Sequence, residues 1–277
     1  MILSNLMIDP IILNAFKEDM PYGDISTDSL FNGSEISSGK LIAKENGILA
    51  GSQVFKRVFE LLESDIKIEF NFNDGDSIKN RDIIATIKGK SVSILKGERI
   101  ALNLLQRMCG IATKTKTLVD ALDDDKIRLV DTRKTTPNLR VLEKYAVTVG
   151  GGYNHRFSLS DAVMLKDNHI KAAGGIIEAV EKVRKKIPHT MTIEVEVESL
   201  QQVKKALEAK ADIIMLDNMD NVKIEKAIAI INKQALVEIS GNITLDNIKQ
   251  KAIKGVDIVS SGAITHSIKA FDISLKF

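Results

Sequence analysis

Residues 192–217 read TIEVEVESLQQVKKALEAKADIIMLD. The segment opens with strict alternation of aliphatic and acidic residues over Thr192–Val197, which is typical of a β-strand. A helix-like run follows at Leu200–Ala209, and Ile213–Asp217 is a second strand that stays apolar until its last residue. Two strands joined by one helix of this length indicate a parallel pair with a crossover helix. The segment therefore predicts an α/β fold.

The same alternation extends in both directions, from residue 127 to residue 260. Further strands are predicted at Ile127–Asp131, Ala162–Leu165, Leu236–Ser240 and Val256–Ser260. Further helices are predicted at Asn138–Val149, Ala173–Lys186, Val222–Asn232 and Leu245–Ile253. Six apolar strands with crossover helices favour an α/β barrel over a flat sheet, and the sequence leaves undecided whether the barrel is open or closed.

The first 110 residues have a different pattern and predict a separate domain, so we divide the chain into residues 1–110 and 111–277. Short strand-like runs alternate with turns, which indicates a small antiparallel sheet. The strands are predicted at Ser38–Ala43, Gly47–Ala50, Ile66–Phe72 and Ile83–Lys88. The helices are predicted at Ile8–Glu18, Ser52–Glu63 and Val92–Cys109.

The composition excludes several classes of protein. The 277 residues carry a formal net charge of +2 and only 4% aromatic residues without tryptophan, which argues against a nucleic-acid partner. No apolar run approaches the ~18 residues of a membrane span, and the N-terminus lacks the pattern of a signal peptide. The single cysteine, Cys109, lies in an apolar helical stretch and reads as a buried structural thiol in a reducing compartment, so we expect a cytoplasmic protein.

Polar or glycine residues follow almost every predicted strand of the barrel. In α/β barrels the carboxyl ends of the strands form the active face, so these residues should converge on one site. Loops that simply begin with polar residues would explain serine and asparagine, but they explain charged side chains less well, because buried charges need partners. The groups are Asp131-Thr132-Arg133-Lys134, Lys166-Asp167, Glu196, Asp217-Asn218, Ser240-Gly241-Asn242 and Ser261-Gly262.

Several cations cluster between Asp131 and Ile170, and we interpret them as a site for a small molecule with several negative charges. Arg133 and Lys134 could grip two anionic groups, since arginine offers a planar fork and lysine a compact point charge. Three glycines at Gly150–Gly152 precede Asn154-His155-Arg156, where histidine and arginine could bind a carboxylate. A solvated loop with chance charges is the alternative for each of these segments.

Lys166 ends a predicted apolar strand, where it would act either as an anion binder or as a Schiff-base nucleophile. No base is visible beside it in the sequence, so we favour anion binding.

Glu194, Glu196 and Glu198 fall on one face of their strand because side chains alternate with period two. Facing the barrel interior they would need cations or a metal, whereas on an edge strand they could face water. Glu196 and Asp217 form a reasonable oxygen-ligand pair for Mg²⁺, which binds few carboxylates together with substrate phosphates. The small residues of Ser240–Asn242 and Ser260–Ala263 expose backbone N–H groups suited to a phosphate. The residues alone thus predict substrates that are a phosphosugar and a polycarboxylate.

The order of these motifs resembles the quinolinate phosphoribosyltransferase family (carboxylating nicotinate-nucleotide diphosphorylase), and the resemblance covers nearly the whole chain. It rests on Glu98-Arg99, Leu102-Asn103, Gly110–Thr113, Asp131–Pro137, Gly150–Gly152, Asn154–Arg156, Lys166–His169, Glu194–Val197, Leu216–Asn218 and Gly262–Ser267, with the Gly23-Asp24 turn and Gly47–Gly51.

The resemblance implies an N-terminal α/β sandwich domain followed by an open α/β barrel, with the last residues of the chain returning to the first domain. The implied reaction converts quinolinate and phosphoribosyl pyrophosphate into nicotinate mononucleotide, pyrophosphate and CO₂ in NAD biosynthesis. It also implies no membrane partner and a homodimer or higher homo-oligomer, in which Arg99 reaches the site of the neighbouring subunit.

The resemblance also implies roles for individual residues. The catalytic set would be Lys134, Lys166, Glu196 and Asp217, with Mg²⁺ near the last two, partly through water. Quinolinate would be held by Arg133, His155, Arg156 and Lys166, with Arg99 and Thr132 also among the substrate-binding residues. Phosphoribosyl pyrophosphate would meet Lys134, Glu196, Asp217, Ser240, Gly241, Asn242, Ser261, Gly262 and Ala263.

Three positions depart from the family's usual glycines: Asn138, Ser158 and Asn242. Asparagine tolerates positive φ better than other non-glycine residues, so two of these changes should be mild, while Ser158 could tighten or reposition its loop. None removes a charge. The alternatives to this activity are a non-catalytic metabolite-binding regulator, a molybdenum-locus paralogue on the same fold, and a Schiff-base aldolase that uses Lys166.

Overall fold

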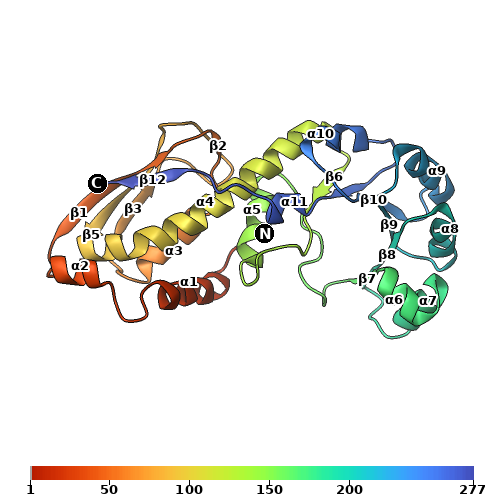
Figure 1. Ribbon diagram of the computed structural model, residues 1–277, viewed down its shortest axis with the longest axis horizontal. Helices are drawn as coiled ribbons and strands as arrows, with labels where there is room; N and C mark the ends of the chain where they lie inside the picture. The colour runs from red at the N-terminus through yellow and green to blue at the C-terminus, as the bar shows by residue number, and fades with distance from the viewer. Residues whose placement is uncertain (1) are drawn as a thin grey trace. The chain divides into compact units, whose positions relative to one another are not determined.

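The computed structural model describes residues 2–277, which form two compact units (Figure 1). The first unit contains the chain up to Lys116 together with Thr135–Gly151 and Ile264–Phe277, and the second contains Thr117–Lys134 and Gly152–Ala263. Neither unit is one continuous stretch of sequence. The division of the sequence at residue 110 therefore stays a proposal about sequence domains rather than a description of these units.

The second unit is built on six parallel strands in the order β6-β11-β10-β9-β8-β7. The two end strands, β6 and β7, do not pair with each other among the described residues, so the barrel is open, as predicted. The strand bounds are β6 Arg128–Val130, β7 Val163–Leu165, β8 Ile193–Val197, β9 Ile213–Asp217, β10 Leu236–Ser240 and β11 Ile258–Ser260.

Helices cover the outer side of this sheet. Figure 1 shows α7 (Ile176–Arg184), α8 (Leu200–Glu208) and α9 (Asn221–Ile231) following one another beside β7 to β10. Two of them begin at a side-chain cap, since Ser199 and Asp220 each accept a backbone N–H of the first turn. Short helical pieces complete the unit at α6 (Asp167–Ala173), α10 (Leu245–Ile248) and a 3₁₀ turn at Lys249–Lys251.

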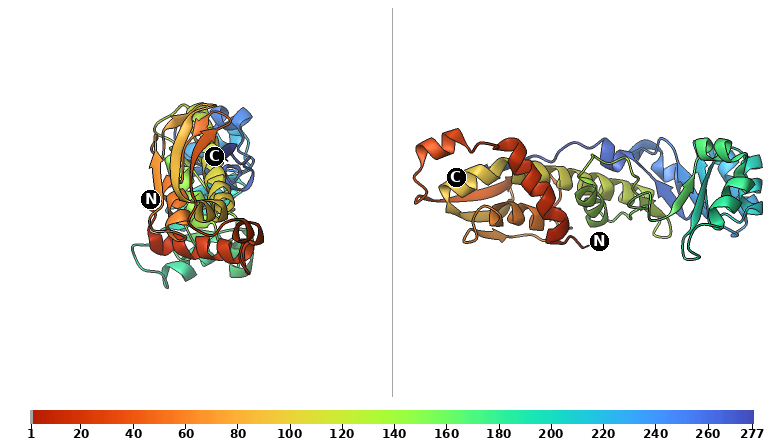
Figure 2. Two further views of the ribbon diagram at one scale, coloured as in Figure 1. Left: turned by 90° about the vertical axis from the view of Figure 1, so that its left-hand side faces the viewer. Right: turned by 90° about the horizontal axis from the view of Figure 1, so that it is seen from below.

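The first unit holds a four-stranded antiparallel sheet in the order β12-β1-β5-β3. The end of the chain supplies its edge strand, and in both views of Figure 2 the C-terminus lies beside the orange strands of this sheet. The strands are β1 Ile36–Ala43, β3 Lys67–Phe70, β5 Ile83–Lys90 and β12 Ile273–Lys276, with a small ribbon of β2 Gly47–Ile48 and β4 Ser77–Ile78. The helices of this unit are α1 Asn5–Asp19, α2 Ile25–Leu30, α3 Ser52–Glu60 and α5 Arg140–Val149, together with most of α4 Ser91–Leu122 and α11 Ala263–His266.

The helix predicted to end at Cys109 is longer than expected, because α4 continues to Leu122. Gly110 is inside the helix and does not end it. A Cβ at this position would collide with the backbone carbonyl of Lys269. The glycine therefore allows the C-terminal segment to pass close against the helix. The helix end predicted at Cys109 is wrong, because Gly110 serves this close approach within the helix.

The helix predicted between the first two barrel strands, α5, belongs to the first unit and does not cover the parallel sheet. The hydroxyl of Tyr145 donates to Asp74 at 2.7 Å, and a Cβ on Gly150 would collide with the carbonyl of Ala112. The strand–helix alternation identified this helix correctly but assigned it to the wrong sheet.

Cys109 is fully buried on α4, and burial raises the pKa of its thiol to about 12. Its sulfur accepts the Ala50 N–H at 3.3 Å. A thiol that stays protonated at neutral pH is a poor nucleophile, so the structural interpretation holds. Over residues 2–277, none of the helices combines the length and the apolar character that crossing a membrane requires.

Candidate functional site

The acidic residues of β8 lie on the side of the sheet away from the helices, as the alternation predicted. Val195 and Val197 are fully buried on the other side of the strand. Neighbouring parallel strands place Glu196 level with Met215 of β9, and Met215 level with Glu238 of β10. The inner face of the barrel therefore carries several carboxylates among apolar side chains.

Lys166 and Glu196 form an ion pair across two neighbouring strand ends. The ammonium of Lys166 lies 2.6 Å from Glu196 Oε2, and the Glu196 side chain is only 16% exposed. Lys166 itself is held by its backbone, because its N–H donates to Nδ1 of His169 on α6 at 3.2 Å. An ammonium bound to a carboxylate can orient an anion but is a poor amine nucleophile. The structure thus favours the anion-binding role predicted for this lysine.

Asp131 organises the segment that carries His155 and Arg156. Its fully buried carboxylate accepts the His155 N–H at 2.9 Å and the Asn154 side-chain amide at 2.7 Å. Arg156 in turn donates from a guanidinium nitrogen to the carbonyl of Ala162 at 3.0 Å. These bonds fix the segment after Gly150–Gly152, so it is not the solvated loop considered above.

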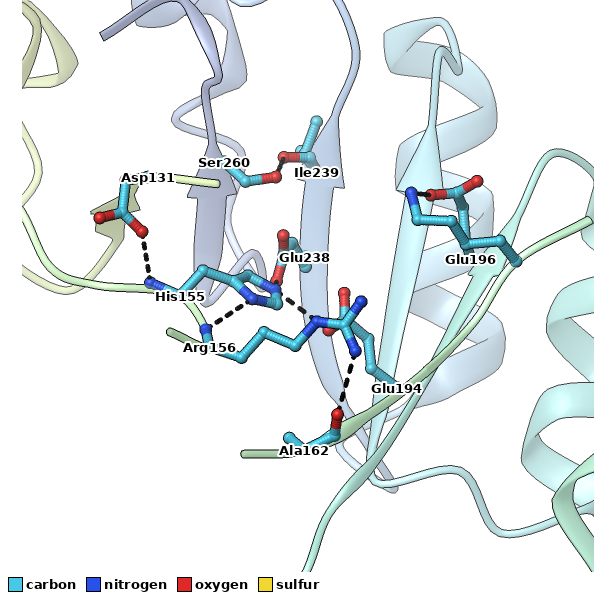
Figure 3. A network of polar contacts seen from close by, with 10 residues as sticks. Asp131, His155, Arg156, Ala162, Glu194, Glu196, Glu238, Ile239 and Ser260 are labelled. Carbon is cyan, nitrogen blue, oxygen red and sulfur yellow. Dashed lines mark hydrogen bonds and ion pairs between the residues drawn. The ribbon is translucent and has the colours of Figure 1, made fainter. Parts of the chain in front are cut away.

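The imidazole of His155 points to two buried glutamates inside the barrel (Figure 3). Its Nε2 lies 3.0 Å from Glu194 Oε2 and 3.6 Å from Glu238 Oε2. The other ring nitrogen, Nδ1, accepts the backbone N–H of Arg156 at 2.8 Å. Because an acceptor nitrogen carries no proton, this geometry assigns the ring proton to Nε2, where it faces Glu194.

The pKa values of His155 and Glu194 are both raised, so this cluster holds its proton more tightly than the free groups would. Burial lowers the pKa of His155, but the neighbouring carboxylates of Glu194 and Glu238 outweigh burial and raise it to about 10. Burial raises the pKa of Glu194, and the hydrogen bond from His155 opposes that shift. A proton on Nδ1 would break the bond from the Arg156 N–H, so the ring proton lies on Nε2, toward Glu194.

The positive charges of Arg133 and Arg156 act on each other at this site. Burial lowers the pKa of Arg156, and the charge of Arg133 lowers it further, while Glu194 acts in the opposite direction. Like charges held together in a partly buried site indicate an anionic ligand, which would relieve their repulsion. On the same strand end, the Lys134 N–H donates to Thr132 Oγ1 at 3.0 Å, which tightens the turn after β6.

The predicted phosphate loop follows β10 and is tied to the end of β9. Gly241 and Asn242 both adopt positive φ, +99° and +50°. The Asn242 side-chain amide donates to Asn218 Oδ1 at 3.3 Å, and Asn218 donates to Asp217 Oδ2 at 2.8 Å. The loop and the carboxylate of Asp217 are therefore parts of one hydrogen-bonded arrangement.

The second small-residue loop follows β11. The Ser261 N–H donates to the carbonyl of Val130 at 3.0 Å, and its hydroxyl donates to the carbonyl of Ile243 at 3.3 Å. Ser261 is buried, so its side chain holds neighbouring loops together. Any phosphate contact in this loop would therefore come from the backbone, toward Gly262 and Ala263.

The departures from the usual glycines have clear local explanations. Asn138 and Asn242 take the left-handed conformation, at φ of 66° and 50°, which confirms that asparagine can serve there. The Ser158 hydroxyl donates to Asp161 Oδ1 at 3.1 Å, and its N–H donates to the other oxygen at 3.0 Å. Ser158 thus tightens the loop that follows Arg156.

Of the predicted substrate-binding residues, all except Arg99 belong to the second unit. They are Thr132, Arg133, Lys134, His155, Arg156, Lys166, Glu196, Asp217, Ser240, Gly241, Asn242, Ser261, Gly262 and Ala263. Arg99 is an exposed residue of α4 in the first unit. Its contribution to a neighbouring subunit stays a prediction.

The sequence reasoning missed several residues of this arrangement. Glu238 was counted only as part of a strand, although an acid inside the run Leu236-Val237-Glu238-Ile239 was a usable signal. Asp131 and Asn218 were quoted within motifs without a role, and both prove to orient their neighbours.

Glu196 and Asp217 have the donor chemistry that Mg²⁺ prefers. They end adjacent, paired strands, β8 and β9, and they offer carboxylate oxygens with no nitrogen or sulfur ligand required. The pair therefore fits an ion that completes its coordination with water and substrate oxygens. His155, Glu194 and Glu238 form another group whose ligand atoms lie within 4.8 Å of one another.

Comparison with known proteins agrees with this geometry. The model of the quinolinate phosphoribosyl transferase N-terminal domain matches residues 24–109, and that of the C-terminal domain matches residues 111–276. The chain belongs to the quinolinate phosphoribosyltransferase family. Together the two domain models of this family account for nearly the whole sequence.

Relatives within the family match along most of their length. A protein of Bacillus subtilis (strain 168) named "Probable nicotinate-nucleotide pyrophosphorylase (carboxylating)" is 42% identical over 273 residues, which are 99% of this chain and 94% of that protein. The crystal structure of NadC from Streptococcus pyogenes is 46% identical, with a TM-score of 0.96, and the match covers 100% of this chain and 98% of that one. The nicotinate-nucleotide pyrophosphorylase of Francisella tularensis is 38% identical, with a TM-score of 0.93, over 99% and 97% of the two chains.

Proposed function

We infer that this chain is a carboxylating nicotinate-nucleotide pyrophosphorylase, which converts quinolinate and phosphoribosyl pyrophosphate to nicotinate mononucleotide, pyrophosphate and CO₂. Membership of the quinolinate phosphoribosyltransferase family supports this activity. The single observation that carries this activity is that three features lie on the strand ends of one barrel. They are a cation cluster, a carboxylate pair and a loop suited to a phosphate.

Quinolinate is a dicarboxylate, and four cationic or hydrogen-bonding side chains are proposed to hold it: Arg133, His155, Arg156 and Lys166. The mutual repulsion of Arg133 and Arg156 is relieved when a dianion lies between them. Lys166, fixed by Glu196 and by the His169 ring, supplies a point charge of defined direction. Orientation of the ring nitrogen toward the sugar is the main catalytic contribution of this group.

Phosphoribosyl pyrophosphate is proposed to lie along β8 to β11. The backbone of Ser240–Asn242 and of Gly262 and Ala263, in the loop that begins at Ser261, receives the 5′-phosphate, since small residues let backbone N–H groups approach it. Lys134 contacts the pyrophosphate, and Glu196 and Asp217 face the ribose. When Mg²⁺ is bound near these two carboxylates, partly through water, it neutralises charge on the pyrophosphate.

The chemistry needs one bond exchange and one carbon–carbon cleavage. The pyridine nitrogen forms a bond to the ribose C1 while the bond from C1 to the pyrophosphate oxygen breaks, and the carboxylates of Glu196 and Asp217 stabilise the cationic sugar carbon electrostatically. The alkylated, positively charged ring then releases the adjacent carboxylate as CO₂, and that ring carbon takes up a proton. The protein's cations bind and orient quinolinate, while the charged ring itself drives decarboxylation.

The direct test is turnover by the purified chain. Incubation with quinolinate, phosphoribosyl pyrophosphate and Mg²⁺ should release pyrophosphate and CO₂ in equal amounts, and either substrate alone should give neither product. Removal of Mg²⁺ by a chelator should lower the rate, and added Mg²⁺ should restore it. Absence of turnover by correctly folded protein would overturn the proposed function.

We also propose a homodimer or higher oligomer in which Arg99 completes the quinolinate site of a neighbouring subunit. Chains with Arg99→Ala should bind quinolinate about tenfold more weakly, as expected for one lost charged contact. Mixing them with Lys166→Met chains should restore part of the activity, because one site of each mixed dimer is then intact. No recovery under conditions where labelled subunits exchange would contradict the contribution of Arg99 across subunits.

The other candidate functions have less support. Retention of Lys134, Lys166, Glu196 and Asp217 argues against a regulator without catalysis, and Arg133 with Asn154–Arg156 argues against a paralogue with another substrate. The ion pair of Lys166 with Glu196 disfavours the Schiff-base aldolase. Borohydride treatment with substrate should therefore leave Lys166 unmodified.

A further inference from the structure

Two glutamates inside the barrel have no part in the roles proposed above. Glu194 lies on β8 and Glu238 on β10, with β9 between them, and both approach the ring of His155 (Figure 3). Glu194 is 3% exposed and Glu238 is fully buried. They are therefore out of reach of solvent, and both contact His155, a residue of the proposed quinolinate site.

Most of the carboxylate oxygens of these two glutamates lack a hydrogen-bond partner, and both side chains face His155. Oε1 of Glu194 and both carboxylate oxygens of Glu238 are buried without a hydrogen-bond partner among the described residues. Nε2 of His155 lies 3.0 Å from Glu194 and 3.6 Å from Glu238. One imidazole edge is thus a polar neighbour that the two carboxylates share, and the charge of Arg156 acts on Glu194 as well.

Such an arrangement is not explained by stability. Burying a carboxylate costs free energy, and replacing a whole buried ion pair with well-packed apolar residues is often neutral or stabilising. The buried glutamates are more reasonably understood through the group that they position. That positioned group is the imidazole of His155, and the imidazole in turn holds the segment that ends in Arg156.

His155 is held through its backbone and through both nitrogens of its ring. Its N–H is bound by Asp131 at 2.9 Å, its Nδ1 accepts the Arg156 N–H at 2.8 Å, and its Nε2 faces the two glutamates. The ring therefore connects the interior of the barrel directly to the backbone of Arg156. A rotation of the ring away from Glu194 and Glu238 would also withdraw Nδ1 from that backbone N–H.

We propose that Glu194 and Glu238 are positioning residues for quinolinate: they hold the His155 ring from inside the barrel, and the ring in turn fixes the backbone that presents Arg156 to the substrate carboxylates. This inference rests on the proposed function of the site. It assigns the two glutamates no contact with the substrate. Their loss should consequently weaken binding of the dicarboxylate and leave the phosphosugar side of the site intact.

The test uses Glu238→Gln, which keeps the size of the side chain and removes its charge. We expect the Kd of quinolinate, measured by calorimetry without the second substrate, to rise about tenfold, as for loss of one interaction with a charged group. The KM of phosphoribosyl pyrophosphate should change less than about twofold. Glu198→Gln is the control, because Glu198 directly follows β8, the strand of Glu194, but is exposed, and it should bind quinolinate as the parent chain does.

A double-mutant cycle shows whether the effect passes through His155. In a His155→Gln background, Glu238→Gln should change the Kd of quinolinate by less than about twofold, because the connection is already broken. Additive effects would overturn the proposal, and so would an equal rise in the KM of phosphoribosyl pyrophosphate. Glu194→Gln repeats the same cycle from β8 and decides the matter if Glu238→Gln does not fold.

The remaining outcomes are also decisive. A tightly bound metal ion in the parent chain that Glu238→Gln lacks would overturn the proposal, since the group would then be a metal site. Failure of the parent chain to bind quinolinate would overturn the proposed function itself. A parent chain that binds quinolinate and a Glu238→Gln chain that binds it equally well would overturn only the positioning role.

Discussion

Replacing Lys166 with methionine should lower kcat/KM for quinolinate by about 100-fold or more, with little change in thermal stability. Methionine keeps the length of the side chain but removes the ammonium that lies 2.6 Å from Glu196. The substrate loses a charged contact, worth a factor of about 10 to 100, and the largely buried Glu196 carboxylate loses its cation, which changes the field at the ribose. Steady-state kinetics with each substrate varied in turn measure the effect.

Lys171→Met is the matched control for this change. Lys171 is an exposed lysine on α6, one turn beyond the end of the same strand, and its nearest acid is Asp167 at 3.7 Å. Lys171→Met should leave kcat and the KM of quinolinate within about twofold of the parent values, because exposed ion pairs contribute little. Lys166→Arg should not restore activity, because a planar guanidinium cannot replace a point charge at this spacing. Near-normal turnover by Lys166→Met would remove this lysine from the catalytic set.

Gly241→Ala should raise the KM of phosphoribosyl pyrophosphate by about 100-fold while leaving the Kd of quinolinate nearly unchanged. The glycine has φ of +99°, and a Cβ there would collide with the side-chain oxygen of Asn218 and lie 2.9 Å from the Asn218 backbone nitrogen. Relief of that collision must displace the phosphate loop or Asn218, which orients Asp217. A displacement of about 1 Å in a substrate-positioning group can cost about 100-fold.

Two controls separate the collision from the cost of positive φ. Gly174→Ala places alanine at φ of +97° with no atom within 4 Å of the new Cβ, so it should lower stability slightly without changing either substrate. Asn242→Gly removes a side chain from the same loop and restores the family's usual residue, so activity should be retained. An equal rise in the KM for phosphoribosyl pyrophosphate in Gly174→Ala would show that backbone strain, and not the site, causes the effect.

Much of the barrel could be predicted because its signals are local. The alternation of Ile193–Val197 and the apolar run of Ile213–Asp217 both gave strands with the predicted bounds or nearly so. Helix ends were less predictable. The helix predicted to end at Cys109 continues to Leu122, and the tertiary structure shows why a glycine stands inside it: Gly110 leaves room for the backbone of Lys269.

The polar strand ends could be predicted to converge, but the partners within the site could not. An inward-facing Glu196 was expected to need a cation or a metal, and the structure pairs it with Lys166, which follows the neighbouring strand. Glu238, which no motif singled out, proved to face His155. Such pairings depend on strand order and register, which a single sequence does not contain.

For this protein, the sequence by itself determined the α/β class, the side of each strand that carries charge, and the order of motifs that places it in its family. These follow from residue periodicity and local spacing. Only the tertiary structure decided that α5 belongs with the antiparallel sheet and that one histidine joins two interior glutamates to Arg156. Those features depend on which distant segments pack together, because the curvature of the sheet brings β8 and β10 to the same ring.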